Sequence, residues 1–191
     1  MMYNEKTPIG IIMGSKSDIQ IMVKAAQILD SFNIKHDDQI ISAHRTPDRL
    51  AWYTKYAEQK NFKVIIAGAG GAAHLPGMIS SFTTIPVIGV PILVYTHTQN
   101  TKLNLRYSSF GGLDSLLSIS EMPNGTSIVS VGINKSINAA LYAIKILANE
   151  DKILKKKLLD HKKKQYEIVM KESKHMKKMG LNNFFDNDNS H

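Results

Sequence analysis

The chain has 191 residues, of which 43% are hydrophobic and 21% charged, the balance of a globular protein with a core of its own. It contains no cysteine, which excludes disulfides, thiolate metal sites and a cysteine nucleophile. No apolar stretch approaches the roughly 20 residues that a membrane span needs, and the first ten residues lack the apolar core of a secretory signal. We therefore expect a cytoplasmic protein that does not enter a membrane.

The formal charge of +8 is concentrated near the C-terminus. Residues 151–191 hold 11 of the 24 Lys and Arg residues but only 6 of the 16 Asp and Glu residues. This tail lacks the interleaved aromatic side chains of a protein that binds single-stranded nucleic acid. The positive charge therefore does not predict a nucleic-acid partner.

Strand-like and helix-like segments alternate over residues 1–150. The first strand is predicted at Ile9–Met13, and apolar residues at positions 19, 22, 26 and 29 then mark one face of a helix. A second strand ends at Gln39–Ile41, and Thr46, as N-cap, opens a second helix with Pro47 at its first position. The further predicted elements are strands at Val64–Ala67, Pro86–Val90 and Ile128–Val131 and a helix at Asn138–Ala148. Buried strands separated by helices predict a three-layer α/β/α sandwich with a parallel sheet.

Two segments fall outside this alternation. Residues 93–112 are polar and lack a clear period, and loops of such length are usually functional or disordered. Residues from Asp151 to about Met179 are rich in lysine and predict a C-terminal helical extension that packs on the core or on a neighbouring subunit. The last ten residues, 182–191, are predicted to be disordered. We therefore expect an α/β domain over residues 1–150 and an extension over 151–191.

Three predicted turns follow strands of the sheet and contain polar or glycine residues. They read "GSKSD" at residues 14–18, "SAHRTP" at 42–47 and "GAGGAAHLPG" at 68–77. Because ligands of open parallel sheets bind beyond the carboxyl ends of the strands, we expect these turns to form one binding site.

The first turn, "GSKSD", precedes a helix whose free N–H groups offer a place for a phosphate. Ser15 or Ser17 can contact that phosphate, and the Asp18 carboxylate suits ribose hydroxyls. The alternative is that the serines only cap the helix. The turn is not a P-loop, because Ser15 separates Gly14 from Lys16 and the required earlier glycine is absent.

The glycine-rich run resembles a dinucleotide-binding fingerprint at Gly68, Gly70 and Ala73. That fingerprint also needs an acidic residue about 20 positions later, and the chain has none between Glu58 and Asp114. We therefore predict no NAD site. The run is interpreted as a backbone-lined surface for a flat ligand.

The second turn places a histidine and an arginine side by side. Arg45 can pair with a phosphate through its planar guanidinium, and His44 can take and return a proton near neutral pH. The alternative for His44 is a hydrogen bond to the backbone of the turn. His44, His74 and Asp18 are too few ligands for a convincing metal site, so no metal is predicted.

With these motifs assembled, the chain resembles the class I N5-carboxyaminoimidazole ribonucleotide mutases, in the phosphoribosylaminoimidazole carboxylase family of purine biosynthesis. The resemblance covers roughly residues 8–150. It rests on "MGSKSD" (13–18), "SAHRTP" (42–47), "AGAGGAAHLPGM" (67–78), "GLDSLLSISEMPNG" (112–125) and "NAAL" (138–141). The third of these favours the mutase branch over the branch of direct carboxylases.

The resemblance implies a flavodoxin-like sheet and a rearrangement without a cofactor. The carboxylate on the exocyclic nitrogen of the substrate, a ribonucleotide monophosphate, leaves as CO2 and is recaptured by ring carbon 4. The family match places the acid–base role on His44. It places contacts to phosphate and ribose on Ser15, Ser17, Asp18, Ser42 and Arg45, and contacts to the base and CO2 on Gly70, Gly71, Ala72 and His74.

The resemblance also implies a homo-octamer, and it makes the departures of this chain visible. The segment at 93–112 is about a dozen residues longer than the corresponding family loop, and we expect a mobile lid or an interface element there. Glu121 and Ser136 stand where the family usually has glutamine and glycine. Two alternatives stay open: direct carboxylation of aminoimidazole ribonucleotide by CO2, and a nucleotide-binding regulatory domain without activity.

Overall fold

The computed structural model describes residues 8–93, 95–96, 106–107 and 109–188. The chain divides into two compact units, Met1–Leu147 and Ala148–His191. No helix in the described ranges is both long enough and apolar enough to cross a bilayer.

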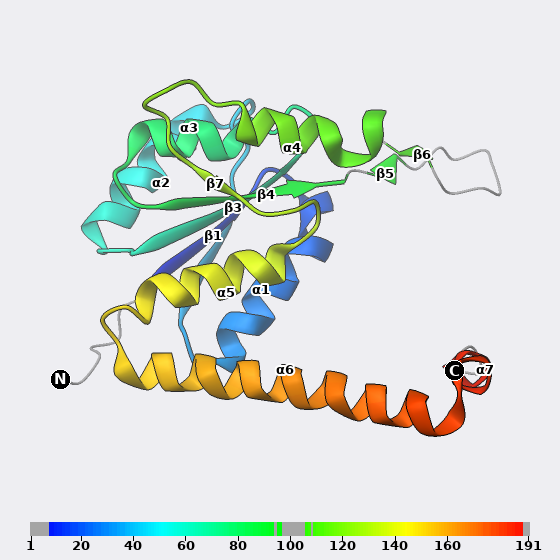
Figure 1. Ribbon diagram of the computed structural model, residues 1–191. Helices are drawn as coiled ribbons and strands as arrows, with labels where there is room; N and C mark the ends of the chain where they lie inside the picture. The colour runs from blue at the N-terminus through cyan, green and yellow to red at the C-terminus, as the bar shows by residue number, and fades with distance from the viewer. Residues whose placement is uncertain (1–7, 94, 97–105, 108, 189–191) are drawn as a thin grey trace. The chain divides into compact units, whose positions relative to one another are not determined.

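The first unit is built on a five-stranded parallel sheet with the order β2-β1-β3-β4-β7. Its strands are β1 (Ile9–Met13), β2 (His36–Ile40), β3 (Val64–Gly70), β4 (Val87–Ile92) and β7 (Val129–Ser130). Its helices are α1 (Ile19–Ser31), α2 (Pro47–Gln59), α3 (Leu75–Phe82), α4 (Leu113–Ser120) and α5 (Ser136–Leu147). Helices α2, α3 and α4 cover one face of the sheet, and α1 and α5 cover the other (Figure 1). The predicted three-layer α/β/α sandwich with a parallel, flavodoxin-like sheet is confirmed.

The central strands are apolar because helices cover them on both faces. All five residues of β1 and all six of β4 are buried. In contrast, β2 pairs only with β1 and reads "HDDQI", with Asp38 and Ile40 exposed. The apolar residues of α1 that reach the core are Met22, Ala25 and Leu29, whereas Ile19, also expected on that face, is 39% exposed.

The segment predicted as a structureless loop contains a short antiparallel pair, β5 (Tyr95–Thr96) and β6 (Arg106–Tyr107). A 3₁₀ turn at Ser109–Gly112 then leads into α4, a helix that periodicity did not predict. The expectation of a lid or an interface element falls largely on residues 94, 97–105 and 108, which lie outside the described residues.

The second unit contains α6 (Lys152–Met179) and α7 (Leu181–Asp188). Asp151 begins α6 as its N-cap, because its carboxylate accepts hydrogen bonds from Ile153 N (2.8 Å) and Leu154 N (3.0 Å). The prediction of disorder over 182–191 is wrong for residues 182–188. These residues form most of α7, where the Phe184 ring packs edge-on against His175 of α6 at 5.7 Å.

Candidate active site

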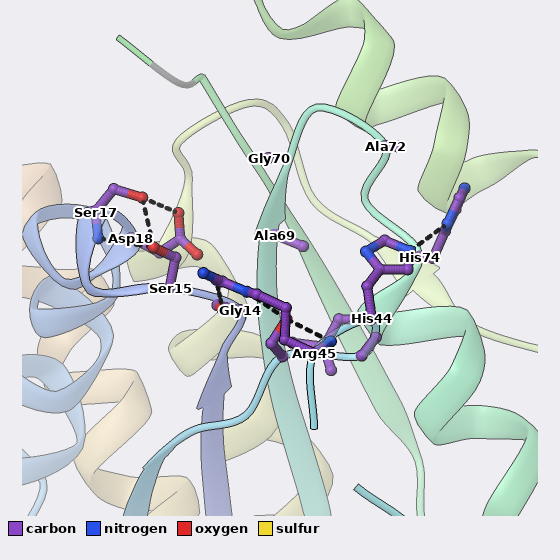
Figure 2. A pocket seen from close by; sticks show the side chains of 13 residues that line it. Gly14, Ser15, Ser17, Asp18, His44, Arg45, Ala69, Gly70, Ala72 and His74 are labelled. Atoms are coloured by element: carbon purple, nitrogen blue, oxygen red, sulfur yellow. Dashed lines mark hydrogen bonds between the residues drawn. The ribbon is translucent and has the colours of Figure 1, made fainter. Parts of the chain in front are cut away.

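A pocket of about 330 Å³ opens at the carboxyl ends of β1, β2 and β3. The strand order reverses direction between β1 and β3, and such a switch point is where flavodoxin-like sheets bind ligands. The volume lies at the lower end of the range for small-molecule sites. The pocket is lined by Gly14, Ser15, Ser17, Asp18, Ser42, Ala43, His44, Arg45, Ala69, Gly70, Ala72, His74 and Leu75 (Figure 2).

The first loop forms a 3₁₀ turn at Lys16–Asp18 before α1. Ser15 Oγ accepts a hydrogen bond from Ser17 N at 3.3 Å and so caps this short turn, whereas α1 itself begins at Asp18 without a side-chain cap, so the alternative that a serine caps the helix does not hold for α1. The Ser17 hydroxyl lies 3.2 Å from Asp18 Oδ1 (Figure 2). Asp18 is only 3% exposed, and this burial raises the pKa of its carboxyl group, while the Ser17 hydrogen bond and the nearby Arg45 cation oppose the rise. The loop is thus closed by its own serines and presents a buried carboxylate to the pocket.

The second loop joins β2 to α2, and Pro47 is the first residue of α2, as predicted. The Thr46 side chain does not cap the helix. It accepts a hydrogen bond from Ser42 N and donates one to Ser42 O, each at 3.0 Å, which closes the loop on itself. Ser42 Oγ in turn accepts from Arg45 N (3.3 Å) and Arg45 Nε (3.2 Å). The guanidinium is therefore held over the pocket by the same serine that lines it.

Two hydrogen bonds at the backbone of Gly14 connect the first loop to the second loop and to β3, which leads into the third loop. Arg45 Nη2 donates to Gly14 O at 3.3 Å, and Gly14 N donates to Gly68 O on β3 at 3.2 Å. At Gly68 a Cβ would collide with the Met22 sulfur, so a side chain there would force the Met22 side chain of α1 to shift. Gly14 therefore holds all three loops in register.

The third loop brings a second histidine to the first. His44 Nε2 and His74 Nδ1 are 2.9 Å apart, with the two rings nearly perpendicular at 82° (Figure 2). One nitrogen of this pair must donate and the other accept, so only one proton can lie between them. The alternative reading of His44, a bond to the backbone of its own turn, is not what the geometry shows. The pair can carry one positive charge and pass one proton.

The structure brings together all of the predicted site residues except Gly71. Gly71 has φ +62°, and it turns the chain between the neighbouring Gly70 and Ala72, which do line the pocket. Motif reasoning did not name Gly14, Ala43, Ala69 and Leu75 as site residues. Each of these four residues is next in sequence to a predicted site residue. Extending the prediction by one residue on either side of the named positions would have found them.

The glycine-rich run does not lead directly into a helix, as a dinucleotide fingerprint would require. Helix α3 begins only at Leu75 and has 8 residues. Within the part of the chain that the structure describes, no three His, Asp or Glu side chains are grouped to hold a metal ion.

Strand order and pocket position together define a flavodoxin-like, doubly wound α/β protein with its site at the switch point. Residues 8–167 match the AIR carboxylase family, and the chain belongs to that family.

Two relatives show that members of this family differ in name and in length. The N5-carboxyaminoimidazole ribonucleotide mutase of Pyrococcus horikoshii is 46% identical over 179 residues, which are 94% of each chain. The chloroplastic phosphoribosylaminoimidazole carboxylase of Vigna aconitifolia is 40% identical over 95% of this chain but only 30% of its own length. Among solved structures, Treponema denticola PurE superposes with a TM-score of 0.74 at 28% identity, over 88% of this chain and 98% of that one.

Proposed function

We propose that this chain is an N5-carboxyaminoimidazole ribonucleotide mutase of purine biosynthesis. The main support for the proposal is the pocket at the switch point of the sheet. It combines the His44–His74 pair with hydroxyl, carboxylate and guanidinium groups that can bind a phosphorylated ribose. Relatives that carry this name match the chain over nearly its whole length, with 94% of both chains covered in the Pyrococcus enzyme. The enzyme converts N5-carboxyaminoimidazole ribonucleotide into 4-carboxy-5-aminoimidazole ribonucleotide.

The phosphate and ribose of the substrate are assigned to the first two loops. Ser15, Ser17 and Ser42 offer hydroxyl groups, and the Arg45 guanidinium supplies a positive charge suited to phosphate oxygens. The buried Asp18 carboxylate is assigned to the ribose hydroxyls, which can donate to it.

The flat base and the CO2 fragment are assigned to the third loop. Gly70 and Ala72 line the pocket with little or no side chain, so a planar ring can approach their backbone closely, and Gly71 provides the turn between them. His74 stands at the end of this run against His44. A close fit there holds the released CO2 near ring carbon 4, where otherwise it would diffuse into water.

The reaction needs one proton to be added to the substrate and one to be removed from it. When the N–CO2 bond of the substrate breaks, the exocyclic nitrogen gains a proton; when carbon 4 bonds to CO2, that carbon loses its own proton. The balance is zero, so one imidazole can give the first proton and remove the second. His44 is assigned this role, and His74 Nδ1 can accept a hydrogen bond from His44 Nε2 while His44 is positively charged. No cofactor or metal enters these steps.

Direct carboxylation of aminoimidazole ribonucleotide is the less favoured alternative. The Vigna relative that is named a carboxylase is a much longer protein, of which this chain covers 30%. We further propose a homo-octamer in the cytoplasm, with residues 1–150 forming the mutase domain and 151–191 an extension that contacts a neighbouring subunit.

The test is turnover of freshly prepared N5-carboxyaminoimidazole ribonucleotide, followed by the ultraviolet absorbance of its product, without ATP, metal or added bicarbonate. We expect product formation above the uncatalysed rate, and a loss of about 10²–10⁴-fold in kcat for His44→Asn. His175→Asn, in the other compact unit, is the matched control and should leave the rate unchanged. Turnover only of the decarboxylated ribonucleotide with CO2 would point to the carboxylase, and no turnover of either substrate to a binding domain.

A further inference from the structure

Helices α1 and α5 lie side by side on one face of the sheet (Figure 1). Apart from Ile144, the buried residues of α5 are one serine and three alanines, Ser136, Ala139, Ala140 and Ala143. Small side chains at a contact let two helix axes come closer together. A polar side chain of α5 can therefore reach the backbone of α1.

Ser136, the first residue of α5, makes such a contact. It is fully buried, and its hydroxyl donates a hydrogen bond to Ile21 O at 2.5 Å, across 115 positions of the sequence. In a helix the Ile21 carbonyl already accepts the N–H of the residue four positions later, so Ser136 uses the second lone pair of that oxygen. Ser136 does not line the pocket, so direct contact with the substrate does not account for its hydroxyl.

The acceptor lies in the first turn of α1, directly after the loop that faces the pocket. Ile21 is the third residue of α1, and Asp18, the N-cap of this helix, provides no side-chain cap. Residues 15, 17 and 18 of the preceding loop line the pocket (Figure 2). A shift of this turn along the helix axis would move the loop relative to Arg45, on the opposite side of the pocket. Because a misplacement of about 1 Å can cost a site much of its activity, the position of the turn matters.

We propose that Ser136 is a positioning residue for the phosphate of the substrate. Its bond to Ile21 O holds the first turn of α1, and with it the loop at residues 14–18, where the phosphate binds. This role rests on the proposed function, which assigns phosphate and ribose to the first two loops. Without the bond, only a fraction of the molecules presents the loop in its binding position, and the apparent Kd rises by the inverse of that fraction. The His44–His74 pair lies on other loops, so the chemical step should not change.

Ribose 5-phosphate has the sugar and the phosphate of the substrate but no base, so its binding measures this role directly. We expect Ser136→Ala in the full-length protein to raise the Kd for ribose 5-phosphate, measured by calorimetry, about three- to tenfold, the range for one hydrogen bond. KM for N5-carboxyaminoimidazole ribonucleotide should rise by the same factor, while kcat stays within about twofold of wild type. An unchanged Kd overturns the proposal, and so does a fall in kcat at unchanged KM.

Two further variants separate the hydrogen bond from packing. Ser136→Cys fills nearly the same space, but a thiol is a weak donor, so we expect it to bind ribose 5-phosphate as weakly as Ser136→Ala does. It also keeps the test decisive if Ser136→Ala is too unstable to purify. Ser136→Thr keeps the hydroxyl and should return the Kd to within about twofold of wild type. If the cysteine variant binds like wild type, or the threonine variant no better than the alanine variant, the hydrogen bond is not the cause and the proposal is wrong.

Ser115→Ala is the matched control. Ser115 is also fully buried, and its hydroxyl donates to Ile92 O (3.1 Å) and Gly112 O (2.8 Å), at the end of β4 and in the turn before α4. The variant removes a buried hydroxyl without altering a bond to α1, so the Kd for ribose 5-phosphate should stay within about twofold of wild type. A rise equal to that of Ser136→Ala would mean that any loss of a buried serine weakens binding, which contradicts the proposed role.

The binding and turnover measurements also distinguish this role from the proposed function. If the wild type binds ribose 5-phosphate but does not turn over the mutase substrate, the function is wrong, and the Kd values of the Ser136 variants still decide the positioning role. If the wild type turns over the substrate and ribose 5-phosphate binds equally well to all variants, the function stands and the positioning role fails. A wild type that binds no ribose 5-phosphate overturns the phosphate assignment and the role of Ser136 together.

Discussion

Gly10, in the middle of β1, is expected to tolerate no side chain while Tyr53 keeps its hydroxyl. A Cβ at Gly10 would lie 2.5 Å from Tyr53 Oη and 3.3 Å from two carbons of the Phe62 ring. Tyr53, on the buried side of α2, is fully enclosed, so its rigid ring has nowhere to move. Its hydroxyl and Asp37 Oδ1 are both buried without a hydrogen-bond partner among the described residues. Burial and the negative charge of Asp37 raise the pKa of the Tyr53 hydroxyl, which therefore stays protonated.

The cost of Gly10→Ala follows from these contacts. Overpacking of a filled core costs about 1–3 kcal/mol, and the loss of glycine's freedom in the unfolded chain returns about 0.4–1 kcal/mol. We expect a net destabilisation of about 1–2 kcal/mol. Tyr53→Phe removes a hydroxyl that has no partner within hydrogen-bonding distance, although the Asp37 carboxylate is near enough to raise its pKa, and should change stability by less than about 1 kcal/mol. In the double variant G10A/Y53F the main collision is gone, so the two changes should couple by about 1–2 kcal/mol.

Urea unfolding at one fixed protein concentration measures all four proteins of this cycle. With a slope of about 1–3 kcal/mol per molar urea, Gly10→Ala should lower the midpoint by roughly 0.3–2 M. The double variant should recover most of that shift. If the two single effects simply add, the Tyr53 hydroxyl is not what excludes a side chain at Gly10, and the reasoning fails.

Three further outcomes are expected. Burial raises the pKa of Asp18, so the folded protein keeps the carboxyl proton to higher pH than the unfolded chain and loses stability once the carboxyl ionises. Asp18→Asn should therefore be more stable than wild type in urea at pH 7, and this advantage should vanish below about pH 4. Arg45→Lys loses the bonds to Ser42 Oγ and Gly14 O and should raise KM about tenfold with a smaller change in kcat, and an unchanged KM would remove Arg45 from substrate binding. Asp151→Ala removes the cap of α6 and should cost that helix about 1 kcal/mol, which thermal melts followed by circular dichroism would detect.

Most of the fold could be predicted because the central strands are apolar and the turns are rich in glycine. Where prediction was inexact, the residues explain why. Strand β3 continues past Ala67 to Gly70, since its small residues still pair with Pro91 and Ile92 of β4, although their composition does not indicate a strand. The edge strand β2 has no strand-like apolar period because none of its five residues is fully buried. In α7 the Phe184 ring packs against His175 of α6, a contact that the polar composition of residues 182–191 does not indicate.

The candidate site was predictable to the level of loops, but not to the level of atoms. Strand ends of a parallel sheet meet at one edge, so three polar loops could be expected to converge. The contact between His44 and His74 joins residues 30 positions apart and needs the actual path of the third loop. The role of Gly14 in joining the three loops likewise depends on carbonyl and amide directions that sequence does not specify.

Both outer edges of the sheet resist the addition of a foreign strand. Strand β7 pairs over only two residues, too few to act as a template, and β2 presents the charged side chain of Asp38 along its free edge. Polymerisation through sheet edges, the route to fibrils, is thereby discouraged at neutral pH.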